Sequence, residues 1–489
     1  EIAQCLVGSE MCIRDSYKQN MSNKKREYVE ITISSDSDSN SDLEIVRENI
    51  IQTSSNNTVK KQKIASTRGT PYPQFKLLST NIRSDFTLSL DELLRPMSLT
   101  DNTNEVHLMT SYDTCPLLVK EQLERYPNIN IILLTTMPEN YEKHKRLEII
   151  KLEVKNDGWA DMYHSKYLIK QNDNNLEVYI GTGNFNPLEF EVVQNIWFYS
   201  GRLRRLDTET QTNKTNIFLQ NFDRMFSLLS KRMNSNGTKK ISKFVSTFKQ
   251  FDFENLRNYN IVIHHFDMAM NDILKGHNTD LEISQEDNLH LTVQCSSIGR
   301  WVSIPNKILN FFSEIVFKTK NVKTMFNIIF PSINEVIKTR NINVAPYFHS
   351  PVFNEKIKEN VRGINEAIGY KNNFNNPSHS KTYMLRQKNK ILWYYMTSAN
   401  LSMTSWSNGS YYRKVKTHEL GVSVLARKNL EINYINLAEA IVENKRFDEY
   451  DTVGKTGKID VFGLINEKFD FTKKQPEYEN FDFRTCSGI

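Results

Sequence analysis

Long hydrophobic runs are missing from this chain of 489 residues. No apolar run comes near the roughly 20 residues that a membrane-spanning helix needs. Cysteine is scarce as well, and the few cysteines form no CxxC pair and no metal-ligand spacing; they are Cys5, Cys12, Cys115, Cys295 and Cys486. This set favours a reducing compartment and argues against structural zinc.

The charge balance sets only a weak limit on the partners of this protein. Its formal net charge is +6, which permits a polyanionic partner without requiring one. Hydrophobic residues make up 39% of the chain, an ordinary share for a globular protein. The length can hold two to three domains with sizeable cores.

The first 70 residues differ in character from the rest. Residues 1–20 match nothing that follows, and we interpret them as a non-native leader, with the true start at Met21. Residues 21–70 contain one aromatic residue, Tyr28, and a serine- and aspartate-rich run from Ser34 to Asp42. Such a composition cannot bury enough apolar surface to offset chain entropy, so we predict a disordered regulatory tail.

Two short patterns in this tail each have two interpretations. The basic runs at residues 24–26 and 60–63 could serve nuclear import, or they could only solvate the chain. Val29-Glu30-Ile31-Thr32-Ile33, followed by acidic residues, resembles a segment that adds a strand to SUMO, but a chance apolar patch explains it as well. The sequence leaves both pairs of alternatives open.

From Pro71 onward, strand and helix patterns alternate. Periodicity predicts strands at 106–109, 129–134, 163–170 and 176–181, and helices at 115–126 and along Phe218, Phe222, Phe226 and Leu229. A second pass repeats the order, with strands at 261–263, 289–293, 325–330, 381–385 and 390–396 and a helix at 307–317. We therefore predict a duplicated α/β fold, with two similar α-β-α sandwich halves at 71–255 and 256–489.

One tripeptide occurs once in each predicted half, as His164-Ser165-Lys166 and as His379-Ser380-Lys381. An asparagine that ends a turn-like segment follows each histidine after 20 or 21 residues; the segments are Gly181-Thr182-Gly183-Asn184 and Thr397-Ser398-Ala399-Asn400. Imidazole can attack phosphorus or move a proton, lysine supplies positive charge, and asparagine supplies an amide donor. The pattern points to a phosphate site.

The repetition predicts one shared site. Within a strand, a histidine and a lysine two positions apart lie on the same face. If the halves pack about a pseudo-twofold axis, one histidine can attack in line while the other protonates the leaving oxygen. The lysines and asparagines would stabilise the charge. Because no carboxylate cluster lies near the motifs, we expect no metal and no other cofactor.

These residues resemble the phospholipase D superfamily, and within it the tyrosyl-DNA phosphodiesterase branch. The superfamily has an aspartate five positions after each lysine, where this chain has Gln171 and Arg386. That absence is typical of the branch. Further sequence segments resemble those of this branch. They are Gln194-Asn195-Ile196-Trp197, Ser296-Ser297-Ile298-Gly299, Pro331-Ser332, residues 379–384, residues 397–402 with Trp406, and Glu419-Leu420-Gly421-Val422.

The resemblance implies hydrolysis of 3′-phosphotyrosyl and other 3′-adduct bonds on DNA, through a covalent phosphohistidine and with a 3′-phosphate as product. His164 would be the nucleophile, and His379 the general acid and then the base. Four residues would hold the phosphate: Lys166, Lys381, Asn184 and Asn400. Gln194 and Glu419 would orient the histidines. Ser297 and Ser402 would contact DNA phosphates, and Trp159 would stack on a base.

The resemblance has departures and leaves alternatives. Tyr163 precedes His164 where many members have a second histidine, and Trp159 lies one position from the family's stacking aromatic residue. A superfamily nuclease or lipid phosphodiesterase, or a non-catalytic nucleic-acid-binding protein, are the alternatives. Both His-Lys-Asn sets are complete, which favours an enzyme. The resemblance further implies a monomeric nuclear protein that binds single- and double-stranded DNA; a mitochondrial location and the range of adducts stay open.

Overall fold

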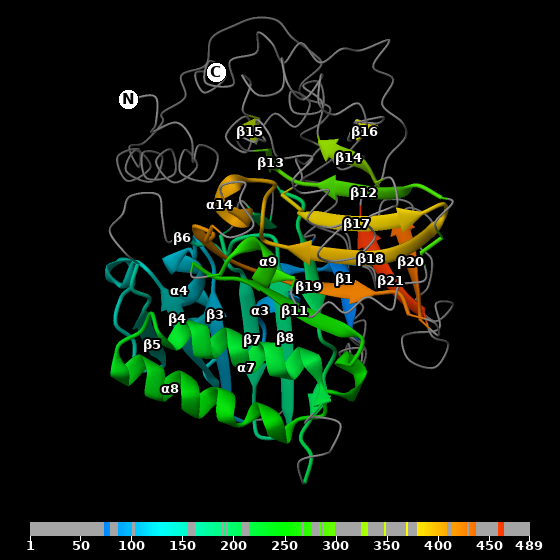
Figure 1. Ribbon diagram of the computed structural model, residues 1–489. Coiled ribbons are helices and arrows are strands. Elements are labelled where there is room, and N and C mark those ends of the chain that lie inside the picture. Colours follow the sequence, from blue (N-terminus) through cyan, green and yellow to red (C-terminus); the bar gives the residue numbers. More distant parts are fainter. Residues whose placement is uncertain are drawn as a thin grey trace, which may run out of the picture. The chain divides into compact units, whose positions relative to one another are not determined.

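A computed structural model places the strands of the chain in two large sheets (Figure 1). It describes residues 73–78, 87–99, 103–154, 162–186, 189–190, 193–207, 215–266, 268–274, 283–284, 287–298, 324–330, 347–348, 368–369, 379–407, 413–427, 430–436 and 458–463. Pro71 to Ile489 belong to one compact unit. The predicted leader, the tail with its two patterns, the helix at 307–317 and Trp159 lie outside the described residues.

The first sheet is built from the first predicted half. Its strands follow the order β2-β1-β9-β8-β7-β3-β4-β5, and β10 pairs with β8. The bounds are β1 Gln74–Leu78, β2 Thr87–Leu88, β3 Glu105–Thr110, β4 Ile129–Thr135, β5 Leu147–Lys151, β7 Tyr167–Gln171, β8 Asn175–Gly181, β9 Ile196–Tyr199 and β10 Leu203–Arg204.

The second sheet follows the order β11-β19-β18-β17-β12-β14-β16, with β20, β21 and β6 attached beside this path. Its bounds are β6 Met162–Tyr163, β11 Tyr259–His264, β12 Leu289–Gln294, β14 Thr324–Phe330, β16 Ile368–Gly369, β17 Thr382–Gln387, β18 Lys390–Thr397, β19 Thr417–Leu425, β20 Glu431–Asn436 and β21 Lys458–Gly463. A separate pair joins β13 Ser297–Ile298 to β15 Tyr347–Phe348.

Seven strands repeat in the same order in both sheets. The path β1-β9-β8-β7-β3-β4-β5 corresponds strand by strand to β11-β19-β18-β17-β12-β14-β16. The first four pairings along each path are antiparallel and the last two are parallel. The predicted mixed α/β class is confirmed, and the repeated topology is consistent with the predicted pseudo-twofold duplication.

Alternating side chains cover both faces of the first sheet. On β9, Ile196 and Phe198 join one apolar cluster, whereas Trp197 and Tyr199 join another, as the two-residue period of a strand dictates. Helices α7 (Ile217–Ser230) and α8 (Ser235–Ser246) pack on the first cluster, and Figure 1 shows them across one face of the sheet. Helices α3 (Leu90–Leu94) and α4 (Pro116–Arg125) pack on the second.

The remaining helical segments among the described residues are short. They are α9 Met270–Ile273, α14 Met403–Trp406 and the 3-10 turns η2 Pro138–Asn140, η3 Phe248–Gln250 and η4 Glu254–Leu256. None of the helices in the described part of the chain is long and apolar enough to cross a membrane.

One predicted strand is wrong in a way that matters for the site. Residues 163–170 do not form a single strand, because β6 ends at Tyr163 and β7 begins at Tyr167. β6 pairs with β19 of the second sheet, whereas β7 lies in the first. His164 donates its backbone N–H to the carbonyl of His418 over 2.9 Å. The first His-Ser-Lys motif therefore crosses from one sheet to the other.

Candidate active site

Each His-Ser-Lys motif is bound to the opposite half by the same main-chain contact. The N–H of His164 reaches the carbonyl of His418 over 2.9 Å, and the N–H of His379 reaches the carbonyl of Gln194 over 2.8 Å. The serine that follows each histidine donates to the same two carbonyls, over 3.1 Å and 3.3 Å. The two motifs thus occupy equivalent positions in the repeated topology, and each is held by the other half.

His164 is buried and paired with a carboxylate from β19. Its Nδ1 lies 2.7 Å from Oε2 of Glu419. The same carboxylate accepts from the hydroxyl of Ser398 on Oε2 over 2.6 Å and from that of Ser405 on Oε1 over 3.0 Å. Glu419 is therefore fixed at both oxygens before it meets the histidine.

The protonation of Glu419 decides the tautomer of His164. Burial by itself raises the pKa of this carboxyl, but His164, Lys166 and the Ser398 hydroxyl outweigh burial and bring the pKa to about 2. An ionised carboxylate can only accept, so Nδ1 of His164 is the donor. The lone pair of the neutral imidazole then resides on Nε2, which makes Nε2 the nucleophilic nitrogen.

His379 is paired in the same manner, with a residue that the sequence analysis did not identify. Its Nδ1 lies 3.0 Å from Oε2 of Glu189, and both side chains are buried. Burial raises the pKa of Glu189, but the proximity of His379 and Lys381 and hydrogen bonding lower it overall. Nδ1 of His379 accordingly donates to an ionised carboxylate, and Nε2 is the nitrogen that can exchange a proton with substrate.

The two lysines of the motifs are fully buried. Lys166 donates from Nζ to the carbonyl of its own His164 over 2.7 Å. The carbonyls of Lys166 and Lys381 accept from Gly181 and Thr397, so the lysines are anchored to the turns that end in asparagine. Both lysines lower the pKa of the carboxyl beside the neighbouring histidine, Lys166 at Glu419 and Lys381 at Glu189.

The two asparagines are oriented differently. Asn400 accepts from the Ser296 hydroxyl through Oδ1 over 3.0 Å, which makes Nδ2 the donor end of its amide. Asn184 donates through Nδ2 to Oε1 of Glu189 over 3.0 Å. Both asparagines therefore present a defined amide, as a phosphate-holding role requires, but Asn184 is shared with a carboxylate.

The other predicted site residues have these positions. Gln194 offers its backbone carbonyl to His379 and Ser380. Ser402 is the N-cap of α14 and accepts from the N–H of Ser405 through its hydroxyl. Ser297 begins β13, and the structure describes only its backbone. Trp159 is outside the described residues. The DNA-contacting roles of these residues stay predictions.

Tyr163, which stands before the first motif, packs behind the site. Its ring stacks on that of His418 with centroids 4.6 Å apart, and Nδ1 of His418 meets the hydroxyl of Ser165. Burial and the neighbouring His265 hold the pKa of His418 well below its ordinary value. A neutral His418 is thus a packing group that supports the backbone of His164.

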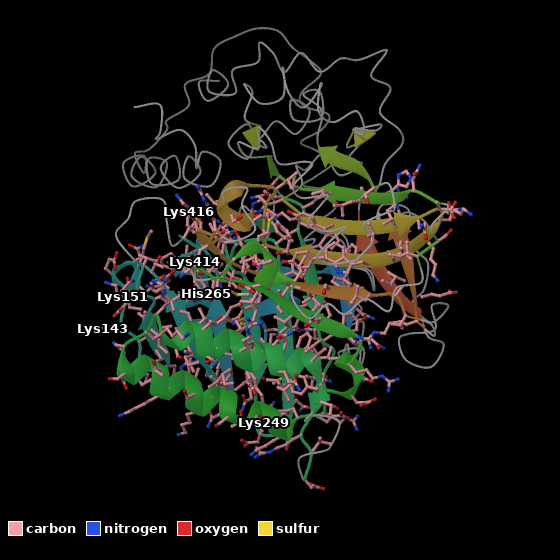
Figure 2. The ribbon with its side chains drawn as sticks, viewed as in Figure 1. Lys143, Lys151, Lys249, His265, Lys414 and Lys416 are labelled. Carbon is pink, nitrogen blue, oxygen red and sulfur yellow. The ribbon has the colours of Figure 1, made fainter. Side chains whose placement is uncertain are left out.

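Lysines lie close in sequence to the segment that carries Glu419. Lys414 is exposed and Lys416 half-buried, just before β19, and Figure 2 labels both of them above Lys151 of β5 and Lys143 of the loop before β5. The carbonyl of Lys416 accepts from the N–H of Met162. Positive charge therefore accompanies the crossing between the sheets. Among the described residues, no three His, Cys, Asp or Glu side chains are grouped as a metal site.

Comparison with known proteins shows a match to one protein family. The family model described as tyrosyl-DNA phosphodiesterase matches residues 73–461. The crystal structure of the yeast tyrosyl-DNA phosphodiesterase has a TM-score of 0.54 and 17% identity, over 74% of this chain and 92% of that chain. The crystal structure of a histidine-to-alanine variant of the yeast protein has a TM-score of 0.53 and 17% identity, again over 74% of this chain and 92% of that chain. At this identity the likeness concerns the fold. No curated protein sequence matches the chain.

Proposed function

The chain belongs to the tyrosyl-DNA phosphodiesterase family of DNA-repair phosphodiesterases, and we propose that it hydrolyses 3′-phosphotyrosyl bonds on DNA through a phosphohistidine. The observation that carries this proposal is the pair of buried histidines, each with Nδ1 bonded to a carboxylate of the opposite half. Two imidazoles oriented by fixed acceptors suit a reaction that needs one nucleophile and one proton carrier.

In the first step, Nε2 of His164 attacks the phosphorus of the 3′-phosphotyrosyl group. An N–P bond forms, the bond from phosphorus to the tyrosyl oxygen breaks, and His379 gives its Nε2 proton to that oxygen. Lys166, Lys381, Asn184 and Asn400 stabilise the charge on the non-bridging oxygens. The tyrosyl peptide leaves as a neutral phenol.

In the second step, His379 removes a proton from water, and the water oxygen attacks phosphorus. The N–P bond breaks, its electron pair returns to His164, and the DNA retains a 3′-phosphate. The histidine that acted as acid in the first step acts as base in the second, as the exchange of one proton requires. This step restores the starting form of both histidines.

The proposal extends to partners and location. We propose that Ser297, Ser402 and Trp159 contact the DNA strand, that the protein acts as a monomer in the nucleus, and that Val29–Ile33 contacts SUMO. The lysines near β19 support a polyanionic substrate, since positive charge near a site attracts phosphates.

The test offers a single-stranded oligonucleotide with a 3′-phosphotyrosine, with and without EDTA. We expect release of tyrosine and a 3′-phosphate end at the same rate in both. No cleavage, or cleavage that strictly needs a divalent metal, would contradict the proposal. An unmodified oligonucleotide and a phosphatidylcholine vesicle, offered in parallel, should stay intact; hydrolysis of either one in preference would indicate a nuclease or a lipid phosphodiesterase.

A further inference from the structure

Ser405 of the short helix α14 is buried and bonded to two adjacent strands of the second sheet. Its carbonyl oxygen lies 2.7 Å from Nδ1 of His264 in β11, and its hydroxyl donates to Oε1 of Glu419 in β19 over 3.0 Å. His264 and Glu419 are opposite each other in the β11–β19 pair. Because a carbonyl can only accept, Nδ1 of His264 is the donor, and burial keeps this ring neutral by lowering its pKa to about 4. One residue therefore ties α14 to both strands.

Ser402, the N-cap of α14, continues these contacts toward the surface. Its side chain is half-buried, donates to Oγ of Ser405 over 3.2 Å and accepts from the N–H of Ser405 over 3.4 Å. The hydroxyl of Ser405 donates in turn to Glu419, whose Oε2 lies 2.7 Å from Nδ1 of His164. An unbroken series of hydrogen bonds thus runs from Ser402 through Ser405 and Glu419 to the proposed nucleophile.

The outer end of this series lies among the predicted substrate contacts. The family resemblance implies that Ser402 contacts a DNA phosphate, and the N–H of Ser402 donates to the carbonyl of Asn400 over 2.8 Å. A serine hydroxyl has one hydrogen, so a Ser402 that donates to a phosphate oxygen no longer donates to Ser405. Its oxygen can still accept from the N–H of Ser405 and from the hydroxyl of Thr404, which lies 2.9 Å away. Contact with the DNA strand would therefore redistribute the hydrogen bonds of Ser405.

We propose that Ser405 is a positioning residue that transmits the contact of Ser402 with a DNA phosphate to Glu419, and through Glu419 to His164. This coupling rests on the proposed function. Hydrogen bonds in a series strengthen one another, so the loss of the bond from Ser402 weakens the bond that Ser405 gives to Glu419. The carboxylate then holds the Nδ1 hydrogen of His164 more strongly, and Nε2 becomes a better nucleophile. Ser405 acts through Glu419 and does not touch the reacting atoms.

The test compares two substrates with the same leaving group. One is thymidine 3′-(p-nitrophenyl phosphate), and the other is a single-stranded oligonucleotide with the same group at its 3′ end. Release of p-nitrophenolate in the first turnover reports the attack alone: an N–P bond to His164 forms while the phenolate departs with the bonding electron pair, without a proton from His379. The mononucleotide has no second phosphate and cannot make the contact at Ser402.

For the wild-type protein we expect the saturated first-turnover rate to be about three- to fivefold higher on the oligonucleotide, since the coupling changes only part of one hydrogen bond to a charged group. In Ser405→Ala the ratio of the two rates should fall to about one, and Ser405→Thr, which keeps the hydroxyl, should retain part of it. Ser200→Ala is the matched control. Ser200 is also a buried serine, but its hydroxyl bonds to backbone groups of Val178 and Gly201, and its loss should leave the ratio unchanged.

A double-mutant cycle tests whether the two serines act in series. Ser402→Ala should lower the ratio and raise KM for the oligonucleotide. The double variant Ser402→Ala/Ser405→Ala should have the same ratio as Ser405→Ala, because either change interrupts the same series of hydrogen bonds. Additive losses in the double variant would overturn the coupling, and so would an unchanged ratio in Ser405→Ala or equal rates on both substrates in the wild-type protein.

Failure of the proposed function would have a different result, because the wild-type protein would then release p-nitrophenolate from neither substrate. If Ser405→Ala does not fold, as judged by circular dichroism, Ser402→Ala decides. The coupling predicts that this variant has a lower first-turnover rate at saturating oligonucleotide. A contact that only binds the strand would raise KM and leave the saturated rate unchanged, which would overturn the role of Ser405.

Discussion

The same two residues, serine and lysine, follow His164 and His379, yet the loss of each histidine should have a different effect. His164→Ala removes the nucleophile and should lower tyrosine release by at least about 10³-fold. His379→Ala keeps the nucleophile, so it should still attack a p-nitrophenyl substrate but fail to hydrolyse the intermediate. A denaturing gel of protein mixed with labelled oligonucleotide would reveal the covalent adduct.

The exposed His144 supplies the control for this comparison. His144→Ala should match the wild-type protein in rate and show no adduct. An adduct in His164→Ala and none in His379→Ala would reverse the assignment of nucleophile and proton carrier.

The pKa of Glu419 makes a second prediction at this scale. In the folded protein it is about 2, below the ordinary value of 4.5. A lowered pKa stabilises the fold at pH values above 4.5, and this stabilisation is lost as pH falls toward 2. At neutral pH this stabilisation contributes roughly 3 kcal/mol to the free energy of unfolding. Urea unfolding of wild type and Glu419→Gln between pH 2 and pH 7 should therefore give free energies that differ most at neutral pH and converge in acid. A constant difference would contradict it.

Of the two carboxylates that pair with the histidines, Glu419 could be predicted from the sequence and Glu189 could not. The histidines, lysines and asparagines could be chosen from sequence because their spacing repeats. Glu189 could not, because its partner His379 is 190 residues away and the equivalent strand position carries Asn195. The prediction for Gln194 rests on a sequence segment that resembles the family. The contact that Gln194 makes with His379 uses its backbone carbonyl, which any residue offers.

At the scale of elements, Gly421 lies where β19 leaves no room for a side chain beside β18. A Cβ at this position would lie 2.4 Å from the carbonyl oxygen of Met396 and 2.5 Å from the Tyr395 ring. The backbone oxygen cannot yield without opening the strand pair, and Glu419 is two residues away. We expect Gly421→Ala to destabilise the protein by about 1–3 kcal/mol and to lower kcat.

Gly237 in α8 is the control for this substitution. Its added Cβ would meet Cγ2 of Ile150 at 2.8 Å, which is a side-chain methyl and not backbone, and alanine favours a helix over glycine. Thermal unfolding and steady-state assays of both variants would check the contrast. Equal effects of Gly421→Ala and Gly237→Ala would show that close packing at β19 does not hold Glu419 in place.

The elements themselves were largely predictable, for a physical reason. Strands such as β4 and β12 bury most of their residues, and helix α7 buries one face, so their hydrophobic period is visible in sequence. The break between β6 and β7 was not visible. Residues 164–166 leave the strand because the backbone N–H of His164 and the hydroxyl of Ser165 both bond to the carbonyl of His418 in the other half, and no local pattern records a partner about 250 residues away.

At the scale of the whole molecule, one apolar cluster joins both predicted halves. It contains Phe75 and Phe198 of the first sheet together with Tyr259 and Tyr394 of the second. The ring of Phe75 lies 5.1 Å from that of Tyr394 and 6.2 Å from that of Tyr259, between centroids. The division near residue 255 therefore separates two sheets but not two cores, which suits a site whose histidines each need a carboxylate from the other half.

Phe75→Ala tests this shared core. We expect a loss of about 3–5 kcal/mol in the free energy of unfolding, because a fully buried aromatic side chain is removed from a packed cluster. Since the cavity lies between the sheets, amide hydrogen exchange should rise in β11 and β18 as well as in β1 and β9.

Leu123→Ala is the control: Leu123 is buried in the second cluster, whose members all lie between residues 88 and 199. Leu123→Ala should raise amide hydrogen exchange around α4 and β4. When it is compared with Phe75→Ala at the same overall stability, it should leave β11 and β18 protected. If Phe75→Ala also left β11 and β18 unchanged, the two halves would be independently stable, and their coupling would have to come from the contacts that the two His-Ser-Lys motifs make with the opposite half.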